Sequence, residues 1–166
     1  MKQIWRMSLM MTALIILDQI TKGIVQAKFV LGESVTVING FFNFTYVRNP
    51  GAAFGLGAQS EDYVRMILFK IVPIIACFGL IYWIWKTRNE NKILNVAYSL
   101  IFAGAVGNLI DRIILGYVVD FLDFYYKQHH FPVFNVADSC ITIAAGLIIY
   151  DYFLEYKKNK NVSSSI

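Results

Sequence analysis

The fold is decided by residues 108–139, NLIDRIILGYVVDFLDFYYKQHHFPVFNVADS, which place two aspartates at the two ends of a short polar passage between hydrophobic runs. Asp120 lies near the start of this passage and Asp138 near its end, where a new apolar run begins. If both flanking runs cross a membrane, the chain leaves the bilayer before Asp120 and re-enters it near Asp138, so both carboxyl groups lie on one side. Two carboxyl groups that share a proton can act as an aspartic-protease pair. The alternative is structural, with a polar turn residue at Asp120 and a helix-capping acid at Asp138.

The composition places the chain in a membrane. Of its 166 residues, 57% are hydrophobic and 16% are charged, which is too apolar for a soluble domain. A spanning helix needs about 20 mostly apolar residues, and suitable runs occupy residues 7–27, 64–85, 93–115 and 136–156. We therefore expect a mainly α-helical, polytopic membrane protein with four transmembrane helices, forming a single domain over residues 1–166. Residues 28–63 are expected to form a β-rich outer loop, and residues 157–166 a disordered basic tail.

The distribution of lysine and arginine predicts the orientation. Basic residues gather before the first span, between the second and third, and after the fourth, at Lys2, Arg6, Lys86, Arg88, Lys92, Lys157, Lys158 and Lys160. The positive-inside rule puts these segments and both termini in the cytoplasm, and Asp120 and Asp138 at the extracytoplasmic face. These flanks account for the net charge of +4, so no nucleic-acid partner is expected.

The outer loop carries a hairpin signal. Residues 34–38 and 42–46 alternate with a period of two, and Asn39-Gly40 between them is typical of a tight β-hairpin turn. The aromatic side of the second strand can rest on the membrane surface. The small residues at 48–55, RNPGAAFG, suit the close passage of another backbone, such as an extended peptide.

Two spans carry ionisable groups at membrane depth. Asp18 and Lys22 are four residues apart and share one face of the first span, so we expect them to pair inside the bundle. In the third span Asn108 can reach Asp111 and Arg112, which lie three and four residues further on. Each set can be a structural brace between helices or a polar wall beside the aspartate pair.

The fourth span begins with a capping pattern. Asn135 and Asp138 have the three-residue spacing of a capping box, with aspartate in place of the usual Glu or Gln. This is the structural alternative for Asp138. A helix N-terminus also favours a carboxylate over its neutral form, so within a pair Asp138 is expected to be the ionised member.

Other chemistries have weaker patterns behind them. Cys140 with His129 or His130 lacks any local motif of a cysteine nucleophile. A metal peptidase would draw its ligands from acidic and histidine residues of the outer passage, but the zinc pattern H-E-x-x-H is absent; those ligands would be Asp120, Asp123, His129, His130 and Asp138. A transporter or proton relay would use Asp18, Lys22, Asp111 and Arg112, and it needs ionisable groups spread through the membrane depth. A non-enzymatic assembly factor is a further class.

A set of motifs in fixed order resembles the bacterial lipoprotein signal peptidases, also called signal peptidase II. These motifs are Asp18 with Lys22, NPGAAFG at 49–55, AGAVGNLIDR at 103–112, VVDF at 118–121 and FNVADS at 134–139. The resemblance implies a membrane aspartic peptidase that removes signal peptides from diacylglyceryl-modified prolipoproteins, cutting before the lipidated cysteine, in the bacterial cytoplasmic membrane. It implies Asp120 and Asp138 as the catalytic pair. The expected substrate-binding and supporting residues are Asp18, Lys22, Asn49, Gly51, Asn108, Asp111, Arg112, Asn135 and Ala137.

The resemblance also implies the partners. The expected partners are prolipoprotein substrates and membrane lipid, the expected state is a monomer, and no metal or cofactor is required. A peptide bond in lipid leaves its N–H and C=O groups unsatisfied, at a cost of several kcal/mol. We expect the polar side chains of Asn49, Asn108, Arg112 and Asn135 to satisfy them.

Overall fold

Four helical segments form the body of the protein. The computed structural model describes residues 2–51, 61–89 and 91–163. Within these ranges four helical segments are long and apolar enough to cross a membrane. They are α1 (Lys2–Lys28), the continuous run of α2 (Asp62–Met66), η2 (Ile67–Ile71) and α3 (Val72–Thr87), then α4 (Lys92–Ile114) and α5 (Val136–Ser163). The expected mainly α-helical membrane fold is confirmed.

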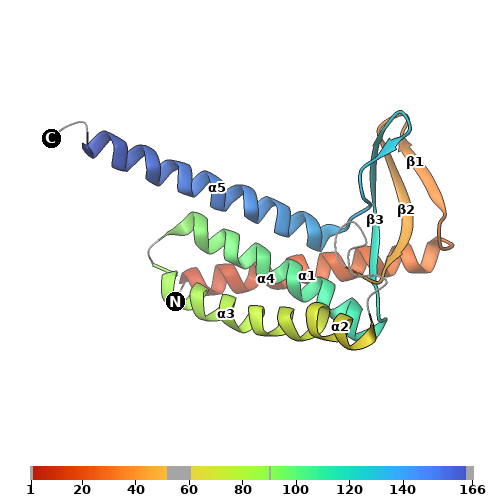
Figure 1. Cartoon of the computed structure of the whole chain (residues 1–166), viewed down its shortest axis with the longest axis horizontal. Coiled ribbons are helices and arrows are strands. Elements are labelled where there is room, and N and C mark those ends of the chain that lie inside the picture. The colour runs from red at the N-terminus through yellow and green to blue at the C-terminus, as the bar shows by residue number, and fades with distance from the viewer. Residues whose placement is uncertain (1, 52–60, 90, 164–166) are drawn as a thin grey trace.

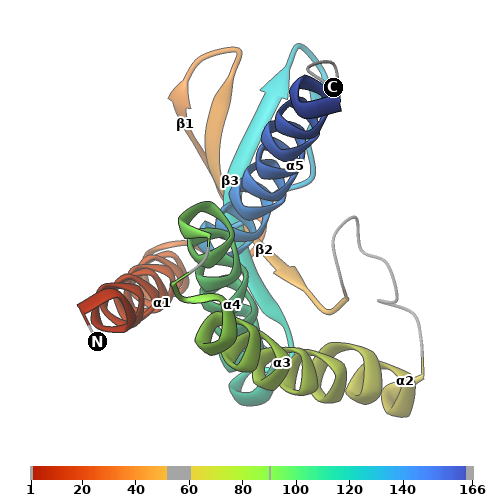
Figure 2. The same ribbon diagram turned by 90° about the vertical axis from the view of Figure 1, so that its left-hand side faces the viewer.

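Helix α4 lies in the middle of the bundle, with α1, α3 and α5 around it (Figures 1 and 2). Half of its most apolar window is buried, compared with 11–22% in the other three segments. The reason is its run of small side chains, since Ser99, Ala103 and Gly107 are all buried where neighbouring helices approach closely. At Gly107 an added Cβ would lie 2.6 Å from Asp18 Oδ2, so this position tolerates no side chain without movement.

A small antiparallel sheet stands at one end of the bundle (Figure 1). Its strands are β1 (Ser34–Ile38), β2 (Phe42–Asn49), β3 (Val118–Tyr126) and β4 (His129–His130), in the order β1-β2-β3-β4. Val25 of α1 packs in one buried cluster with Tyr46, Val119 and Phe121 of the sheet. Because β3 begins four residues after α4 ends, this cluster fixes the position of Asp120 relative to the helices.

The predicted hairpin is confirmed, but its turn differs from the expected one. Ile38 pairs with Phe42, so the loop has three residues rather than two, and Phe41 N–H donates to Ile38 O at 3.1 Å. Gly40 has a φ of +77°, and Asn39 does not have a positive φ. A type I′ turn requires positive φ at both central residues. A bulge between Thr36 and Ile38 shifts the register by one residue and lengthens the loop.

The aromatic side of β2 also differs from the sequence expectation. Tyr46 is buried in the cluster that holds the sheet to α1, whereas Phe42 stacks on Phe124 with ring centroids 4.6 Å apart. Phe42 and Phe44 remain in contact, with ring centroids 5.1 Å apart, and Phe44 packs against the cluster that contains Tyr46. Tyr46 therefore does not lie on an exposed aromatic face, and contact of Phe42 and Phe44 with the membrane surface stays a prediction.

The C-terminal segment extends α5 beyond the expected span. Helix α5 continues to Ser163, so residues 157–163 of the predicted disordered tail are helical, and residues 164–166 lie outside the described residues. The segment contains no glycine or proline that would end the helix. In addition, the Lys157 ammonium group lies 4.7 Å from the centroid of the Phe153 ring, one helical turn earlier.

Candidate active site

Asp120 is buried at the bundle end of β3, with 2% of its surface exposed. Asn135 Nδ2 donates to its Oδ1 at 2.7 Å, and Asn49 Nδ2 donates to its Oδ2 at 3.1 Å. Burial raises the pKa of Asp120 to about 7 and the negative charge of Asp138 adds to this, although the two amide hydrogen bonds lower it. Asp120 can therefore exchange a proton near neutral pH.

Asp138 occupies the third position of α5 and closes the expected capping box. Asn135 N–H donates to its Oδ2 at 3.2 Å, and its own N–H donates to Asn135 Oδ1 at 2.9 Å. Its other oxygen, Oδ1, accepts from Asn108 Nδ2 at 2.8 Å. Helix capping and a place in the polar site are therefore compatible, because they use different oxygens of one carboxyl group.

Asn135 connects the two aspartates. Its amide nitrogen lies against Asp120, while its amide oxygen and backbone N–H both bond Asp138. The same amide nitrogen lies 3.1 Å from Asn108 Oδ1, and Asn135 is fully buried. One asparagine thus brings together two carboxyl groups that lie 18 positions apart in the chain.

A second, ionic cluster lies directly behind the aspartate pair. Lys22 Nζ lies 2.9 Å from Asp18 Oδ2 and 3.1 Å from Asp111 Oδ2, and it donates to Asn108 Oδ1 at 2.9 Å. All four of these side chains are buried. The expected pairing of Asp18 with Lys22 is present, and Asp111 joins it from α4.

The ionic cluster also holds the backbone next to each candidate catalytic aspartate. Asp18 Oδ1 accepts from the N–H of Ala137, the residue before Asp138, at 2.9 Å. Asp111 Oδ2 accepts from the N–H of Val119, the residue before Asp120, at 3.0 Å. The cluster therefore fixes the start of α5 and the start of β3 relative to each other.

Gln19 completes this cluster and was not singled out from the sequence. Its Nε2 lies 3.2 Å from Asp18 Oδ2, 3.0 Å from Asp111 Oδ1 and 3.1 Å from Gly107 O. A glutamine next to Asp18 at membrane depth is a usable signal, because unpaired polar groups there are costly. Gly107, whose missing side chain makes room for Asp18, is signalled by its place on the small-residue face of α4.

The third side of the site is formed by Asn49, Gly51 and Arg112. Gly51 N–H donates to Asn49 Oδ1 at 3.0 Å, and Arg112 Nη2 donates to Gly51 O at 2.9 Å. Arg112 Nε is buried and has no hydrogen-bond partner in the described part of the chain. Arg112 borders a cavity of about 290 Å³ whose other lining residues come from the β2 end, α2, η2 and the link between α4 and β3: Pro50, Asp62, Arg65, Met66, Phe69, Lys70 and Gly116. Residues 52–55 of the glycine-rich segment lie outside the described residues.

Among the described residues, neither a cysteine–histidine pair nor a metal site is formed. His130 Nδ1 lies 2.8 Å from Asp123 Oδ1 on the far part of the sheet, where hydrogen bonds lower the pKa of Asp123 although its burial raises it. No cluster of three potential metal ligands occurs among the described residues. Cys140 packs between apolar side chains of α4 and α5, in a cluster with Ala97, Leu100 and Ala144.

The fold and this site define a multi-pass membrane protein in which one asparagine forms hydrogen bonds with two carboxyl groups at one end of the helix bundle. Residues 10–154 match the model of the family described as signal peptidase (SPase) II. This match spans most of the chain, which therefore belongs to the signal peptidase II family and is a protease.

Individual relatives agree with the family model. The chain is 46% identical over 153 residues to the lipoprotein signal peptidase of Desulforapulum autotrophicum, covering 92% of this chain and 93% of the relative. It is 49% identical over 141 residues to the lipoprotein signal peptidase of Shewanella loihica, covering 85% of this chain and 82% of the relative. A bacterial membrane enzyme solved by the in meso method at 2.3 Å resolution matches with a TM-score of 0.80 and 40% identity, covering 95% of this chain and 92% of that one.

Proposed function

We propose that this chain is an aspartic endopeptidase that removes the signal peptide of diacylglyceryl-modified prolipoproteins, cutting before the lipidated cysteine. The observation that carries the proposal is the shared asparagine, which holds the buried Asp120 and the capped Asp138 in one polar network. With its pKa raised to about 7, Asp120 is partly protonated at neutral pH, where an ordinary aspartate is ionised. The names of the curated relatives support the prolipoprotein substrate.

In the proposed reaction the two aspartates have different tasks. Asp138 acts as the base, because the N–H group of Asn135 and the amide of Asn108 stabilise its carboxylate form. It takes a proton from water while the water oxygen attacks the scissile carbonyl carbon, and Asp120 donates its proton to the carbonyl oxygen. When the tetrahedral intermediate collapses, the C–N bond breaks, Asp138 gives its proton to the leaving nitrogen and Asp120 recovers one from the former carbonyl oxygen.

Neighbouring polar groups suit the binding of the substrate backbone. A peptide bond that leaves the lipid phase needs partners for its N–H and C=O groups. Arg112 lines the cavity beside the site, so its guanidinium group can offer a further N–H to a substrate carbonyl. The cavity of about 290 Å³ beside Arg112 has apolar walls from Met66 and Phe69, which suit the apolar part of a signal peptide.

The orientation is also a proposal. The end of α3 and the start of α4 lie at the end of the bundle away from the sheet (Figure 1). This part of the chain carries Lys86, Arg88 and Lys92, so by the positive-inside rule it is the cytoplasmic end. Lys86 Nζ lies 5.1 Å from the Trp83 ring centroid, and aromatic residues favour the interface. The enzyme then works as a monomer in the bacterial cytoplasmic membrane, with both termini in the cytoplasm and Asp120 at the extracytoplasmic face.

A transporter or proton relay is not favoured. Its candidate residues Asp18, Lys22 and Asp111 are joined in one compact cluster at the sheet end rather than spread along a path. Arg112 faces Gly51 and Phe69 on another side of the site.

Cleavage of a purified precursor tests the proposed function. The full chain in detergent should cut a diacylglyceryl-modified precursor at the bond before the modified cysteine, and mass spectrometry of both products identifies that bond. The same precursor without the lipid is the matched control and should remain uncut. Cleavage of both precursors at the same rate would contradict the proposed substrate class.

Reporter fusions test the orientation. A reporter after Asn39, in the hairpin loop, should be extracytoplasmic, and one after Asn91, between α3 and α4, should be cytoplasmic. The same location for both fusions would refute the four-span topology.

A further inference from the structure

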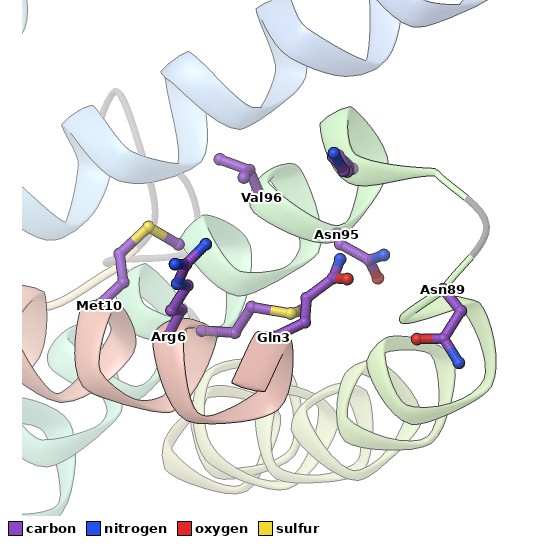
Figure 3. A pocket seen from close by; sticks show the side chains of 8 residues that line it. Gln3, Arg6, Met10, Asn89, Asn95 and Val96 are labelled. Atoms are coloured by element: carbon purple, nitrogen blue, oxygen red, sulfur yellow. The ribbon is translucent and has the colours of Figure 1, made fainter. Parts of the chain in front are cut away.

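A cavity of about 690 Å³ opens at the end of the bundle away from the sheet. It lies between the first turns of α1, the first turns of α4 and the link that follows α3 (Figure 3). This volume is within the range of small-molecule sites, and the cavity shares no lining residue with the candidate active site. Its lining residues are Gln3, Arg6, Met7, Met10, Asn89, Lys92, Asn95 and Val96.

The lining divides into a cationic rim and an apolar wall. Arg6 and Lys92 supply the charge, and neither forms an ion pair with any residue that the structure describes. The buried acid of this end, Asp151, is engaged elsewhere, because Asn91 Nδ2 lies 2.9 Å from each of its carboxylate oxygens. The described residues of the rim are therefore positively charged, and the rim lies where the spans α1 and α4 begin.

The apolar wall excludes a small anion as the best-fitting occupant. Met7, Met10 and Val96 line the cavity next to the cations, and methionine side chains adapt to flexible apolar ligands. Inorganic phosphate would satisfy Arg6 and Lys92 but leave this wall without a partner. An amphiphile with an anionic head and an apolar chain satisfies both parts, as basic pockets between membrane helices do with acidic lipids.

We propose that this cavity binds one anionic phospholipid of the surrounding leaflet, with its phosphate between Arg6 and Lys92 and an acyl chain along Met7, Met10 and Val96. The neutral amides of Gln3 and Asn89 lie at the rim and can bond the remaining head-group oxygens. A lipid held there contacts α1, the link after α3, and α4, and it stabilises the folded bundle by binding it in preference to the unfolded chain.

Lipid titration of the full chain in mild detergent tests this site. The probes are dioleoylphosphatidylglycerol, the neutral lipid dioleoylphosphatidylcholine, and free glycerol 3-phosphate. Native mass spectrometry counts the lipid molecules retained, and a thermal melt reports stabilisation. The unmodified chain should retain one phosphatidylglycerol at concentrations where phosphatidylcholine and glycerol 3-phosphate have no effect. Equal stabilisation by glycerol 3-phosphate would refute the lipid assignment and leave a phosphate site.

Two charge variants separate this cavity from the general basic surface. The double substitution Arg6→Gln with Lys92→Gln should weaken phosphatidylglycerol binding about tenfold to thirtyfold. The matched control is Lys157→Gln with Lys158→Gln, which removes the same charge from the exposed end of α5 and should change binding less than about twofold. Equal weakening by both double variants, or by neither, overturns the proposal.

A third variant keeps the charges and blocks the wall. Val96 is 37% exposed, and in Val96→Trp the larger indole side chain should fill the space assigned to the acyl chain. We expect this variant to lose the retained lipid while its melt in phosphatidylcholine stays unchanged. Unaltered retention of phosphatidylglycerol by Val96→Trp would overturn the proposed acyl-chain position, even if the charge variants fold poorly.

Discussion

This protein contains two pairs of aspartates that lie close together in space, on either side of Asn108, and have different surroundings. Asp18 and Asp111 both contact the ammonium group of Lys22, and each accepts a backbone N–H. Asp120 and Asp138 are held by the amide groups of asparagines, and neither forms an ion pair within the described residues. The ammonium group of Lys22 gives Asp18 and Asp111 a fixed counter-charge, whereas the amide partners of Asp120 and Asp138 are neutral. The first pair therefore suits a structural task and the second suits proton transfer.

The largest expected effect is the loss of cleavage activity when an aspartate of the second pair is replaced. Asp120→Asn and Asp138→Asn nearly preserve side-chain shape but remove proton exchange, so each should lower precursor cleavage by about 10²- to 10⁴-fold or more. The amide at position 138 can still accept the capping hydrogen bond, so its melt should change little. Because the two groups act as a unit, the double variant should be hardly worse than either single one. Substantial turnover by either single variant would refute the catalytic pair.

Substitutions in the ionic cluster are expected to lower the stability of the fold rather than the activity. Asp18→Ala leaves Lys22 with one carboxylate and leaves the N–H of Ala137 unbonded, so the bundle should lose about 3 kcal/mol of stability. Asp18→Asn keeps an acceptor for that N–H and should lose less. A thermal melt and the activity per folded molecule are the two measurements. A normal melt combined with complete inactivity would place Asp18 among the catalytic groups.

A smaller effect is expected from the glycine that makes room for Asp18. In Gly107→Ala the new methyl group would meet Asp18 Oδ2, and displacing this ion-paired side chain should cost about 1–3 kcal/mol. The matched control is Gly146→Ala in α5, where nothing lies within 4 Å of an added Cβ. This control should be neutral or slightly stabilising, because alanine favours a helix more than glycine does. Equal melts for the two variants would show that the close contact at Gly107 does not limit stability.

The smallest effect concerns pH. Because the pKa of Asp120 is raised from 3.8 to about 7, its donor proton is lost above that pH, and cleavage should fall about tenfold per pH unit there. Between about pH 4 and 7 the folded state holds a proton that the unfolded chain has released, so this contribution to stability decreases as the pH rises and is constant above 7. Asp120→Asn should remove that slope from melts recorded across this range. The same slope in the variant would assign the titration to another group.

The candidate site was largely predictable where its signals are local. Asn135 and Asp138 are three residues apart and form the expected capping box, and Asp18 and Lys22 pair across one helical turn as their spacing predicts. The strand β3 was missed, because its hydrogen-bond partner β2 lies some 70 to 80 positions earlier in the chain. The helical end of α5 was missed for a different reason, since a charged sequence without helix breakers can continue an existing helix.

The sequence by itself determined the membrane-spanning architecture. The bilayer admits only chain segments of sufficient length and apolarity whose backbone groups are satisfied internally, and both properties are local. Only the tertiary structure decided which polar groups meet. Asp18 accepts the N–H of Ala137 across 119 positions, and Asn135 reaches Asp120 only because β3 and the start of α5 are held side by side. Such contacts depend on the close approach of α1, α4 and α5, which no local pattern of side chains specifies.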